Sequence, residues 1–255
     1  MRDTSSEEVE NVMSLWNPSI RRSLLLPRPP YSYRQWVIMG FVPRSNDYKV
    51  VAFGGYFSTN VTSFAIYSLI DHRWRIETMT KVNRNVSVKR LQCGGGYVYL
   101  DGVAYWIGGF PNEPEYESHV VCFDFDVEEF SFVELPDAGE EVTGRIAFLL
   151  DESLAVFSVS SKKSCVWVME KDGKGKETWR VWFSGDSNSE ASDFIKDCIY
   201  MNVVILHVKN TDLIFVVLSG NAYYYNIRTQ QLKQCEKTIR RLDSVCTYVE
   251  SLVLH

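Results

Sequence analysis

The stretch from Gly96 to Pro136 constrains the fold of this chain more than any other, because it encodes four short strands in succession. Asp101-Gly102 separates two runs of alternating apolar residues, which is typical of a two-residue hairpin turn. Gly108-Gly109 ends the second strand, and the apolar runs Val120–Phe125 and Phe130–Leu135 supply the next two. Four strands this short cannot bury both of their faces alone, so the stretch predicts several such units packed side by side.

The same arrangement recurs along the chain, with outer turns at Asn17, Asp71, Asp126, Asp172 and Asn226, at steps of 54, 55, 46 and 54 residues. A period of roughly 50 residues with several strands in each period is typical of propeller blades. The strands of the first unit are predicted at 36–42, 48–53, 62–69 and 74–78. Those of the third unit are predicted at 145–150, 154–159, 165–170 and 179–183, and those of the fourth unit at 198–208, 213–218, 222–227 and 232–236. The fold class is therefore all-β, a propeller-like ring of about five four-stranded blades, with six as the alternative.

The two ends of the chain supply the remaining strands of this ring. Residues 1–12 are acidic, polar and without periodicity, so we expect them to be disordered and the propeller domain to occupy residues 13–255. The start of the domain provides two strands within Met13–Leu26, and its end provides one, Cys246–Leu254. Because a ring of blades leaves exposed edges unless its first and last strands join, we expect these segments to share one composite blade.

Composition and charge exclude several classes of function. The formal charge is −5 and no basic stripe is present, which argues against nucleic acid as a partner. No apolar run is long enough to span a bilayer and the N-terminus has no secretory core, so we expect a cytoplasmic or nuclear protein with free thiols at its six cysteines. The four histidines are too scattered to indicate a metal site, and His119 and His207 are interpreted as structural.

The sequence carries no signature of catalysis and indicates no cofactor. It contains no nucleophile elbow, zinc-protease motif, phosphate loop or paired Cys-x-x-Cys. Phe57 and Phe110 follow the double glycines of the first two units, and Tyr116 lies in an acidic loop, Asn112–Glu117, that suits a basic target. Aromatic residues on rigidly mounted loops are good protein contacts, so these three are the candidate partner-binding residues. The alternatives are that the phenylalanines pack between blades and that the acidic loop is merely solvated.

The first two units share a pattern: a double glycine, then an aromatic residue, then Trp or Phe after six further residues. This pattern is similar to a kelch repeat. In that resemblance Trp74, Phe130 and Trp179 pack between neighbouring blades. A closer match covers residues 15–254: LWNPSIRRSLLLP (15–27), YKVVAFGG (48–55), IYSLIDHRWR (66–75), LDGVAYWI (100–107), VVCFDFDVEEFSFVELP (120–136), VWVMEKDGKGKETW (167–179) and YVESLVL (248–254). These seven phrases resemble, in order and spacing, the F-box-associated interaction domain of plant F-box proteins, kelch-associated type.

The resemblance implies a substrate-recognition domain of a cullin-based ubiquitin ligase, in which the propeller holds a target protein and no bond chemistry occurs. The family's F-box, a helical module that grips a Skp-type adaptor, has no counterpart in residues 1–255, where about a dozen polar residues precede Leu15. Adaptor binding is therefore expected only if an F-box is supplied. Two other classes stay open from the residues alone: a small-molecule or glycan-binding propeller, and an enzyme on a propeller scaffold.

Overall fold

The computed structural model describes residues 13–30, 36–53, 60–61, 63–78, 86–87, 96–108, 119–136, 142–171, 173, 176–187, 193–194, 197–198, 205–218 and 220–235. Within these ranges the chain forms strands β1 to β20, and its helical residues are the pairs 193–194 and 197–198. No helix in the described part could reach across a membrane as an apolar span. The fold is therefore all-β, as predicted. Residues 1–12 lie outside the described ranges, so the expected boundary at residue 13 stays a prediction.

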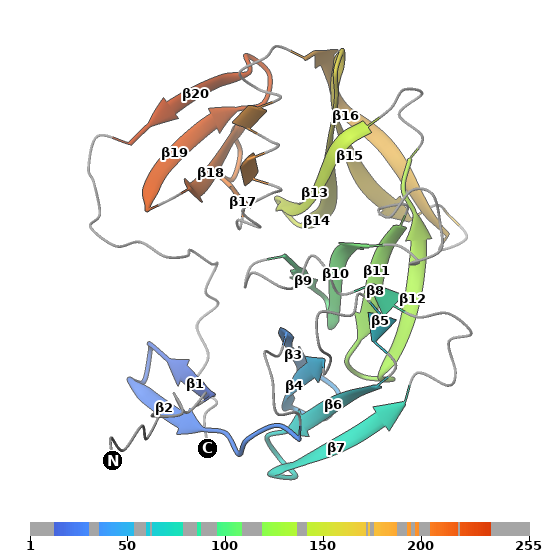
Figure 1. The fold of residues 1–255 in the computed structure, drawn as a ribbon, viewed down its shortest axis with the longest axis vertical. Helices are drawn as coiled ribbons and strands as arrows, with labels where there is room; N and C mark the ends of the chain where they lie inside the picture. Colours follow the sequence, from blue (N-terminus) through green and yellow to red (C-terminus); the bar gives the residue numbers. More distant parts are fainter. Residues whose placement is uncertain are drawn as a thin grey trace, which may run out of the picture.

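The first two predicted four-strand units are present as separate antiparallel sheets (Figure 1). Unit 1 consists of β3 (Trp36–Val42), β4 (Asp47–Phe53), β6 (Ser63–Ser68) and β7 (Arg73–Thr78), in that order from its inner to its outer edge. Unit 2 consists of β9 (Val98–Leu100), β10 (Val103–Gly108), β11 (His119–Asp124) and β12 (Glu129–Glu134). Each strand pairs with the next along the chain, as expected where short turns join them.

Units 3 and 4 are joined into one eight-stranded sheet. Unit 3 consists of β13 (Val142–Leu150), β14 (Ser153–Ser160), β15 (Lys163–Lys171) and β16 (Glu177–Asp186). Unit 4 consists of β17 (Ile205–His207), β18 (Leu213–Leu218), β19 (Asn221–Asn226) and β20 (Gln231–Gln234). The junction is a single parallel bridge between the innermost strands, at Leu149 and Leu206.

Two smaller sheets complete the described part of the chain. The N-terminal hairpin, β1 (Ser14–Asn17) and β2 (Arg22–Leu25), packs its inward face on unit 1 through Leu15, Leu24 and Leu26. A two-residue ladder joins β5 (Asn60–Val61) to β8 (Val86–Ser87). Figure 1 shows the N-terminal hairpin and the four units arranged around a common centre, with β3, β9, β13 and β17 nearest to it.

A repeated local turn sets where the outermost strand of a unit begins. Asp124 ends the third strand of unit 2, and its side chain accepts hydrogen bonds from the backbone N–H groups of Asp126 and Val127 (2.8 and 3.2 Å). Glu128, four residues after Asp124, has a positive φ, and the outermost strand starts at the next residue. Asn and Asp favour such turns because their short side chains mimic a backbone acceptor.

The same turn recurs at the corresponding positions of other units. The capping side chains are Asn17, Ser68, Asp124 and Asn226, and the positive-φ residues four positions later are Arg21, His72, Glu128 and Gln230. The predicted outer turns at Asn17, Asp71, Asp126 and Asn226 are therefore confirmed, and local hydrogen bonds explain where each turn forms. The fifth predicted turn, at Asp172, lies outside the described residues.

Packing between units buries aromatic rings, as the kelch resemblance implies. Phe130 of unit 2 lies against Phe53 and Phe64 of unit 1, with ring centroids 6.3 and 5.3 Å apart. The indole N–H groups of Trp74 and Trp179 donate to the backbone carbonyls of Pro27 and Glu134, which belong to the preceding hairpin and the preceding unit (2.8 and 2.9 Å). The predicted wedge positions are therefore confirmed.

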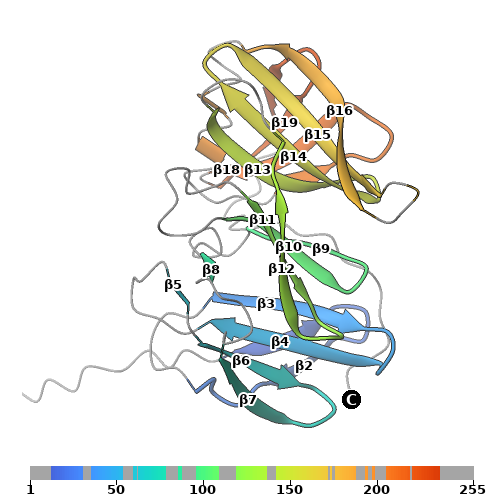
Figure 2. The same cartoon turned by 90° about the vertical axis from the view of Figure 1, so that its right-hand side faces the viewer.

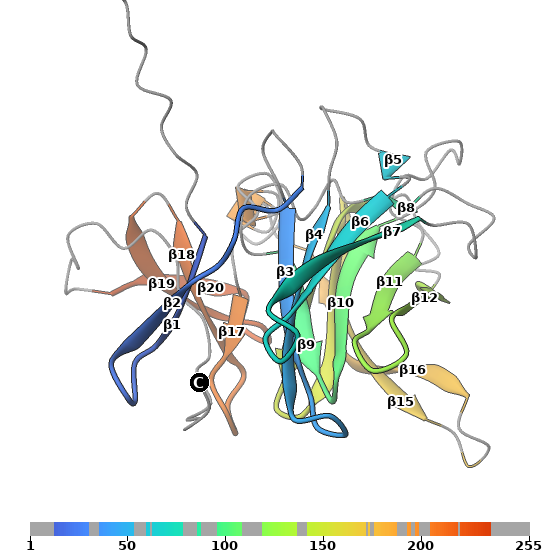
Figure 3. The same ribbon diagram turned by 90° about the horizontal axis from the view of Figure 1, so that it is seen from below.

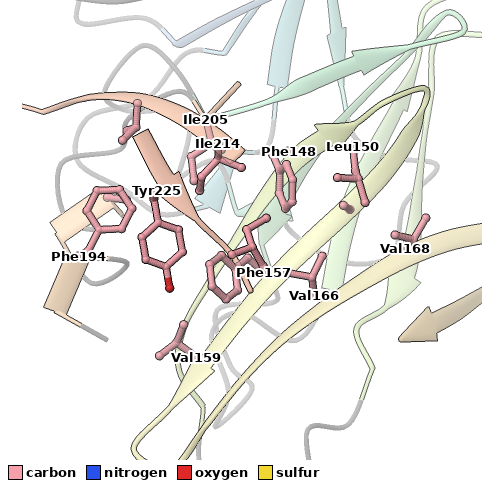
Figure 4. Close-up of a cluster of buried hydrophobic side chains, with 14 residues drawn as sticks. Phe148, Leu150, Phe157, Val159, Val166, Val168, Phe194, Ile205, Ile214 and Tyr225 are labelled. Carbon is pink, nitrogen blue, oxygen red and sulfur yellow. The ribbon is translucent and has the colours of Figure 1, made fainter. Parts of the chain in front are cut away.

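A second buried cluster fills the seam between units 3 and 4 (Figure 4). Phe157 of β14 and Tyr225 of β19 face each other there, and Phe194 stacks on Tyr225 with ring centroids 4.9 Å apart. Phe194 comes from the helical pair 193–194. The connection between units 3 and 4 thus contributes to the core.

One predicted strand is wrong in its extent. The sequence predicted a strand over residues 198–208, but Asp197 and Cys198 are helical and β17 spans only Ile205–His207. Cys198 is fully buried in the cluster of units 3 and 4, so its apolar surroundings reflect core packing and not a sheet. The predicted closing strand Cys246–Leu254 lies outside the described residues, and the blade number stays a prediction with it.

Candidate protein-interaction surface

The two ends of the strands differ in how the chain turns, and Figure 3 shows most of the described hairpin turns along one end. At that end, which we call the turn rim, short turns span 18–21, 43–46, 69–72, 101–102, 125–128, 151–152, 208–212 and 227–230. Every non-glycine residue with positive φ in the described part of the chain lies in one of these turns. At the other end, the loop rim, longer connections leave after Leu25, Phe53, Thr78, Gly108, Glu134 and Asp186, and the short turn 161–162 joins β14 to β15.

Polar side chains of the turn rim bind to the protein itself. His207 is only 3% exposed; its Nε2 lies 2.7 Å from the Thr211 carbonyl, and its Nδ1 lies 3.3 Å from the backbone nitrogen of Asp151. The same Nδ1 lies 3.3 Å from the carboxylate of Asp151, so both ring nitrogens have partners within the chain. The predicted structural role of His207 is confirmed, because the ring ties unit 4 to unit 3.

An ion pair links units 1 and 2 at the same rim. The Lys49 ammonium donates to the Phe125 carbonyl at 2.7 Å and lies 2.8 Å from a carboxylate oxygen of Glu128. Arg75 contacts the other oxygen of Glu128. Lys49 and Glu128 are mostly buried and paired with each other across the seam, so these charges are poorly available to an external partner.

Tyrosine hydroxyls cover the inner edge of unit 1. The Tyr99 hydroxyl accepts the backbone N–H of Phe41 at 3.1 Å and donates to the Phe41 carbonyl at 2.6 Å. Tyr97 makes the equivalent contact with the N–H of Met39 at 3.1 Å. Burial raises the pKa of Tyr99, so the hydroxyl keeps the proton that it donates. These backbone groups on the edge of β3 are therefore hydrogen-bonded within the chain and are poorly available to an added strand.

The loop rim carries the connections that hold the predicted contact residues. Phe57 lies between Phe53 at the end of β4 and β5, and the β5–β8 ladder ties this connection to the one that follows β7. Phe110 and Tyr116 lie between Gly108 and His119, which pair with each other across β10 and β11. Both connections therefore start and end at the same rim, on neighbouring units.

Phe57, Phe110 and Tyr116 themselves lie outside the described residues, so their role as contacts stays a prediction. The described flanks are rigidly mounted: Phe53 and Gly108 are buried, and His119 packs edge-on against Phe132 at 6.4 Å. A loop carried on such flanks presents its side chains from a fixed base, which favours specific recognition.

The chemistry of the described residues suits packing and binding. Burial raises the pKa of the Cys122 thiol to about 12 and that of the Tyr105 hydroxyl to about 12, so both groups stay protonated near neutral pH. A protonated, buried thiol is a poor nucleophile. No cluster of three or more His, Cys, Asp or Glu side chains that could hold a metal ion occurs in the ranges that the structure describes.

Two features of the seams escaped sequence reasoning. The contacts of Tyr97 and Tyr99 with β3, and of Lys49 with Glu128, join residues more than fifty positions apart. The only local signal for them is polar residues in otherwise apolar strand phrases, such as Lys49 within YKVVAF. That signal marks an unusual position but does not name its partner.

Comparison with known proteins identifies relatives of this chain. A family model described as F-box associated beta propeller domain matches residues 4–254. Two Arabidopsis thaliana proteins named as F-box proteins are 25% identical over 182 residues (69% of this chain) and 24% identical over 228 residues (86% of this chain). A third Arabidopsis protein, named as an F-box/kelch-repeat protein, is 25% identical over 209 residues, or 79% of this chain. The matches cover 42%, 59% and 53% of these relatives, so the chain spans about half of their length.

Proposed function

The chain belongs to the F-box-associated β-propeller domain family, and on this premise we propose that it is a target-recognition domain that binds a protein on its loop rim. Its role is recruitment without bond chemistry: a surface of the target docks on the loops and is held there. In an F-box protein, the target would then be brought to a cullin-based ubiquitin ligase through a Skp-type adaptor. We place this activity in the cytoplasm or nucleus, which a fluorescent fusion of the chain would test.

The observation that carries the proposal is the difference between the two rims. Polar groups of the turn rim pair with other groups of the same chain, within and between units, as Lys49 does with Glu128 and His207 with Thr211. The loop rim combines long connections with rigid flanks, and it includes the acidic sequence Asn112–Glu117 and the aromatic residues Phe57 and Phe110. Recognition surfaces commonly combine aromatic anchors with a charged surround.

We expect replacement of Phe57, Phe110 and Tyr116 by serine to abolish capture of the target while leaving the fold intact. Aromatic anchors typically contribute about 2 kcal/mol or more each to an interface, so the loss of three would weaken binding by more than about a thousandfold. The measurement is quantitative mass spectrometry of proteins bound by the wild type and by the triple variant in plant extract. Each differential protein is then purified and titrated against both.

The matched control changes exposed apolar residues of the turn rim, Ile70→Ser and Val127→Ser, which are 57% and 60% exposed. The target should bind this variant as it binds the wild type. Equal loss with both variants, or loss with the control alone, would move the site away from the loop rim. The other outcome is that a sugar or plant metabolite stabilises the wild type strongly against heat and fails to stabilise the triple variant. That outcome would identify the ligand of the loop rim as a small molecule and not a protein.

Coupling to a ligase is expected to need a segment outside residues 1–255. In a pull-down with a purified Skp-type adaptor, this chain alone should give no binding above background, whereas a fusion carrying an F-box before residue 13 should bind. The physical reason is that adaptor binding in this family resides in a helical module, and the described part of this chain is built of strands. Robust binding by residues 1–255 alone would show that the propeller itself contacts the adaptor.

A further inference from the structure

The strands of unit 3 are the longest in the described part of the chain, as Figure 2 shows for β15 and β16. Its second strand, β14, has 8 residues, whereas β10 and β18, the second strands of units 2 and 4, have 6 each. All three strands start at the turn rim. At about 3.3 Å per residue, β14 therefore reaches about 7 Å further at the loop rim, where we place target binding.

The tip of this extension is a fixed turn that carries two lysines. The Oγ atom of Ser160 accepts hydrogen bonds from the backbone N–H groups of Lys162 and Lys163, at 3.3 and 2.8 Å, and donates to the Lys163 carbonyl at 3.2 Å. The N–H of Ser187, which follows β16, donates to the Lys162 carbonyl at 2.7 Å. Lys162 and Lys163 are both exposed. Two cationic side chains thus leave the loop rim from a backbone that is held in place.

The loop-rim end of unit 3 is cationic, although the whole chain has a formal charge of −5. Residues 142–146, 158–165 and 182–187 contain three cations, Arg145, Lys162 and Lys163, and one carboxylate, Asp186, which lies opposite Lys163. The sequence of the neighbouring connection of unit 2, Asn112–Glu117, is acidic. The charge of the loop rim therefore changes sign between units 2 and 3, and complementary charge on a partner favours one orientation of docking.

Below the tip, unit 3 presents a polar row on its face towards unit 2. Arg145, Ser158, Cys165 and Ser184 lie directly opposite one another on the four adjacent strands, so their side chains share a face of the sheet. Val156, two residues before Ser158 on the same face, belongs to the buried cluster between units 2 and 3. The face thus changes from apolar to polar towards the loop rim.

Two hydrogen-bond donors on this face have no acceptor in the described part of the chain. Ser158 is 2% exposed and its Oγ has no partner, and the buried Nε1 of Trp167, two residues after Cys165, has none either. A buried donor without an acceptor destabilises a fold, so the position favours an acceptor that a ligand brings. An ionised carboxylate only accepts hydrogen bonds and therefore complements hydroxyl, indole N–H and guanidinium groups.

We propose that the loop-rim end of unit 3 binds an acidic segment of the target protein. We call this surface the cationic ridge and define it by Arg145, Ser158, Lys162 and Lys163. The inference rests on the proposed function and specifies its chemistry: the target presents carboxylates to unit 3 and basic groups to unit 2. The exposed lysines act mainly on the encounter, because unlike charges attract over a distance and speed association.

The first test needs no identified target. An acetylated poly-glutamate peptide is mixed with the full chain and treated with a carbodiimide, which joins carboxylates to amines that they contact. Mass spectrometry should find Lys162 and Lys163 coupled in several-fold higher yield than Lys171 and Lys176, which are exposed at the turn-rim end of unit 3. Equal yields at the two ends would overturn the proposal. Coupling of the ridge lysines mainly to carboxylates of this same chain would assign the ridge to an internal contact and would also overturn it.

The second test uses a target identified by its loss from the loop-rim triple variant. Lys162→Glu with Lys163→Glu should slow association at low ionic strength by about tenfold and flatten its dependence on salt. Lys171→Glu with Lys176→Glu makes the same change of charge at the other end of unit 3 and should leave both quantities unchanged. Surface plasmon resonance at low and physiological ionic strength measures them.

The two proposals fail in different ways. If the triple variant loses the target while the ridge variant associates like the wild type, the cationic ridge is wrong and the loop-rim function stands. If the triple variant binds the target like the wild type, the loop-rim function is wrong, and the peptide coupling decides the ridge by itself.

Discussion

Replacing Trp106 with alanine is expected to lower the free energy of unfolding by about 3–5 kcal/mol. Trp106 lies on β10, is fully buried, and packs against Phe53 of unit 1 and Phe130 of unit 2 at 6.2 and 6.3 Å between ring centroids. Its removal leaves a cavity where two units meet, and both sheets are held by the same rings. For a domain of this size, the loss corresponds to a fall in Tm of about 10 °C, measured by calorimetry or circular dichroism.

Two companion variants make this result interpretable. Trp106→Phe keeps an aromatic ring in the seam and should cost about 1–3 kcal/mol. Val127→Ala, on an exposed turn, should change the free energy of unfolding by less than about 0.5 kcal/mol. If Trp106→Ala behaved like Val127→Ala, the aromatic cluster between units 1 and 2 would not be part of the cooperative core.

Replacing Gly40 with alanine is expected to destabilise the fold by about 3 kcal/mol through a clash between units. An ideal Cβ on Gly40 would lie 2.8 Å from Cγ of Phe125 and closer still to two other carbons of that ring. Phe125 is fully buried and cannot swing into solvent. A glycine is required on β3 because the ring of the next unit occupies the space of a side chain. Urea unfolding of the purified variant measures the loss.

A double-mutant cycle separates this clash from an effect of alanine on the strand itself. Phe125→Ala alone should cost about 3–5 kcal/mol because it leaves a cavity. In that background, Gly40→Ala should add less than about 0.5 kcal/mol, since the ring that it strikes is gone. Equal costs of Gly40→Ala in both backgrounds would mean that the close approach to Phe125 does not explain the glycine.

These effects concentrate at the seams, which bears on how the domain would bind a target. The loop rim rests on strand ends such as Phe53 and Gly108 that are buried at or beside the aromatic cluster. A change in the seam would therefore alter the base from which the loops emerge. Variants designed to test binding should accordingly be restricted to side chains beyond the strand ends, as in the loop-rim triple variant.

Much of the architecture was predictable because its determinants are local. Asp101-Gly102 encodes a hairpin through its own backbone preferences, and β9 and β10 flank it as expected. The four units follow from alternation and from capping turns, whose hydrogen bonds span three residues or fewer. The strand predicted over 198–208 was wrong in its extent because its apolar pattern is not a local signal. Cys198 is buried in a core that is formed by residues far from it in the chain.

The candidate surface was predictable only in part. The connections that hold Phe57, Phe110 and Tyr116 were correctly assigned to the ends of strands, and the structure places those ends on one rim. The direction of a loop side chain depends on contacts that have no periodic signature. Sequence patterns therefore nominate such residues without orienting them.

By itself, the sequence determined the all-β class, the repeated unit and the turn positions, because each depends on interactions between near neighbours in the chain. The aromatic wedge residues came from the family resemblance. Only the tertiary structure decided that Gly40 makes room for Phe125 and that Glu128 neutralises Lys49. It also decided that Trp16, which precedes the capping residue Asn17, is exposed, whereas Tyr67, which precedes the capping residue Ser68, is buried. Those outcomes depend on which faces of different units meet. These contacts between units are set by the twist and packing of whole sheets, so no short stretch of residues encodes them.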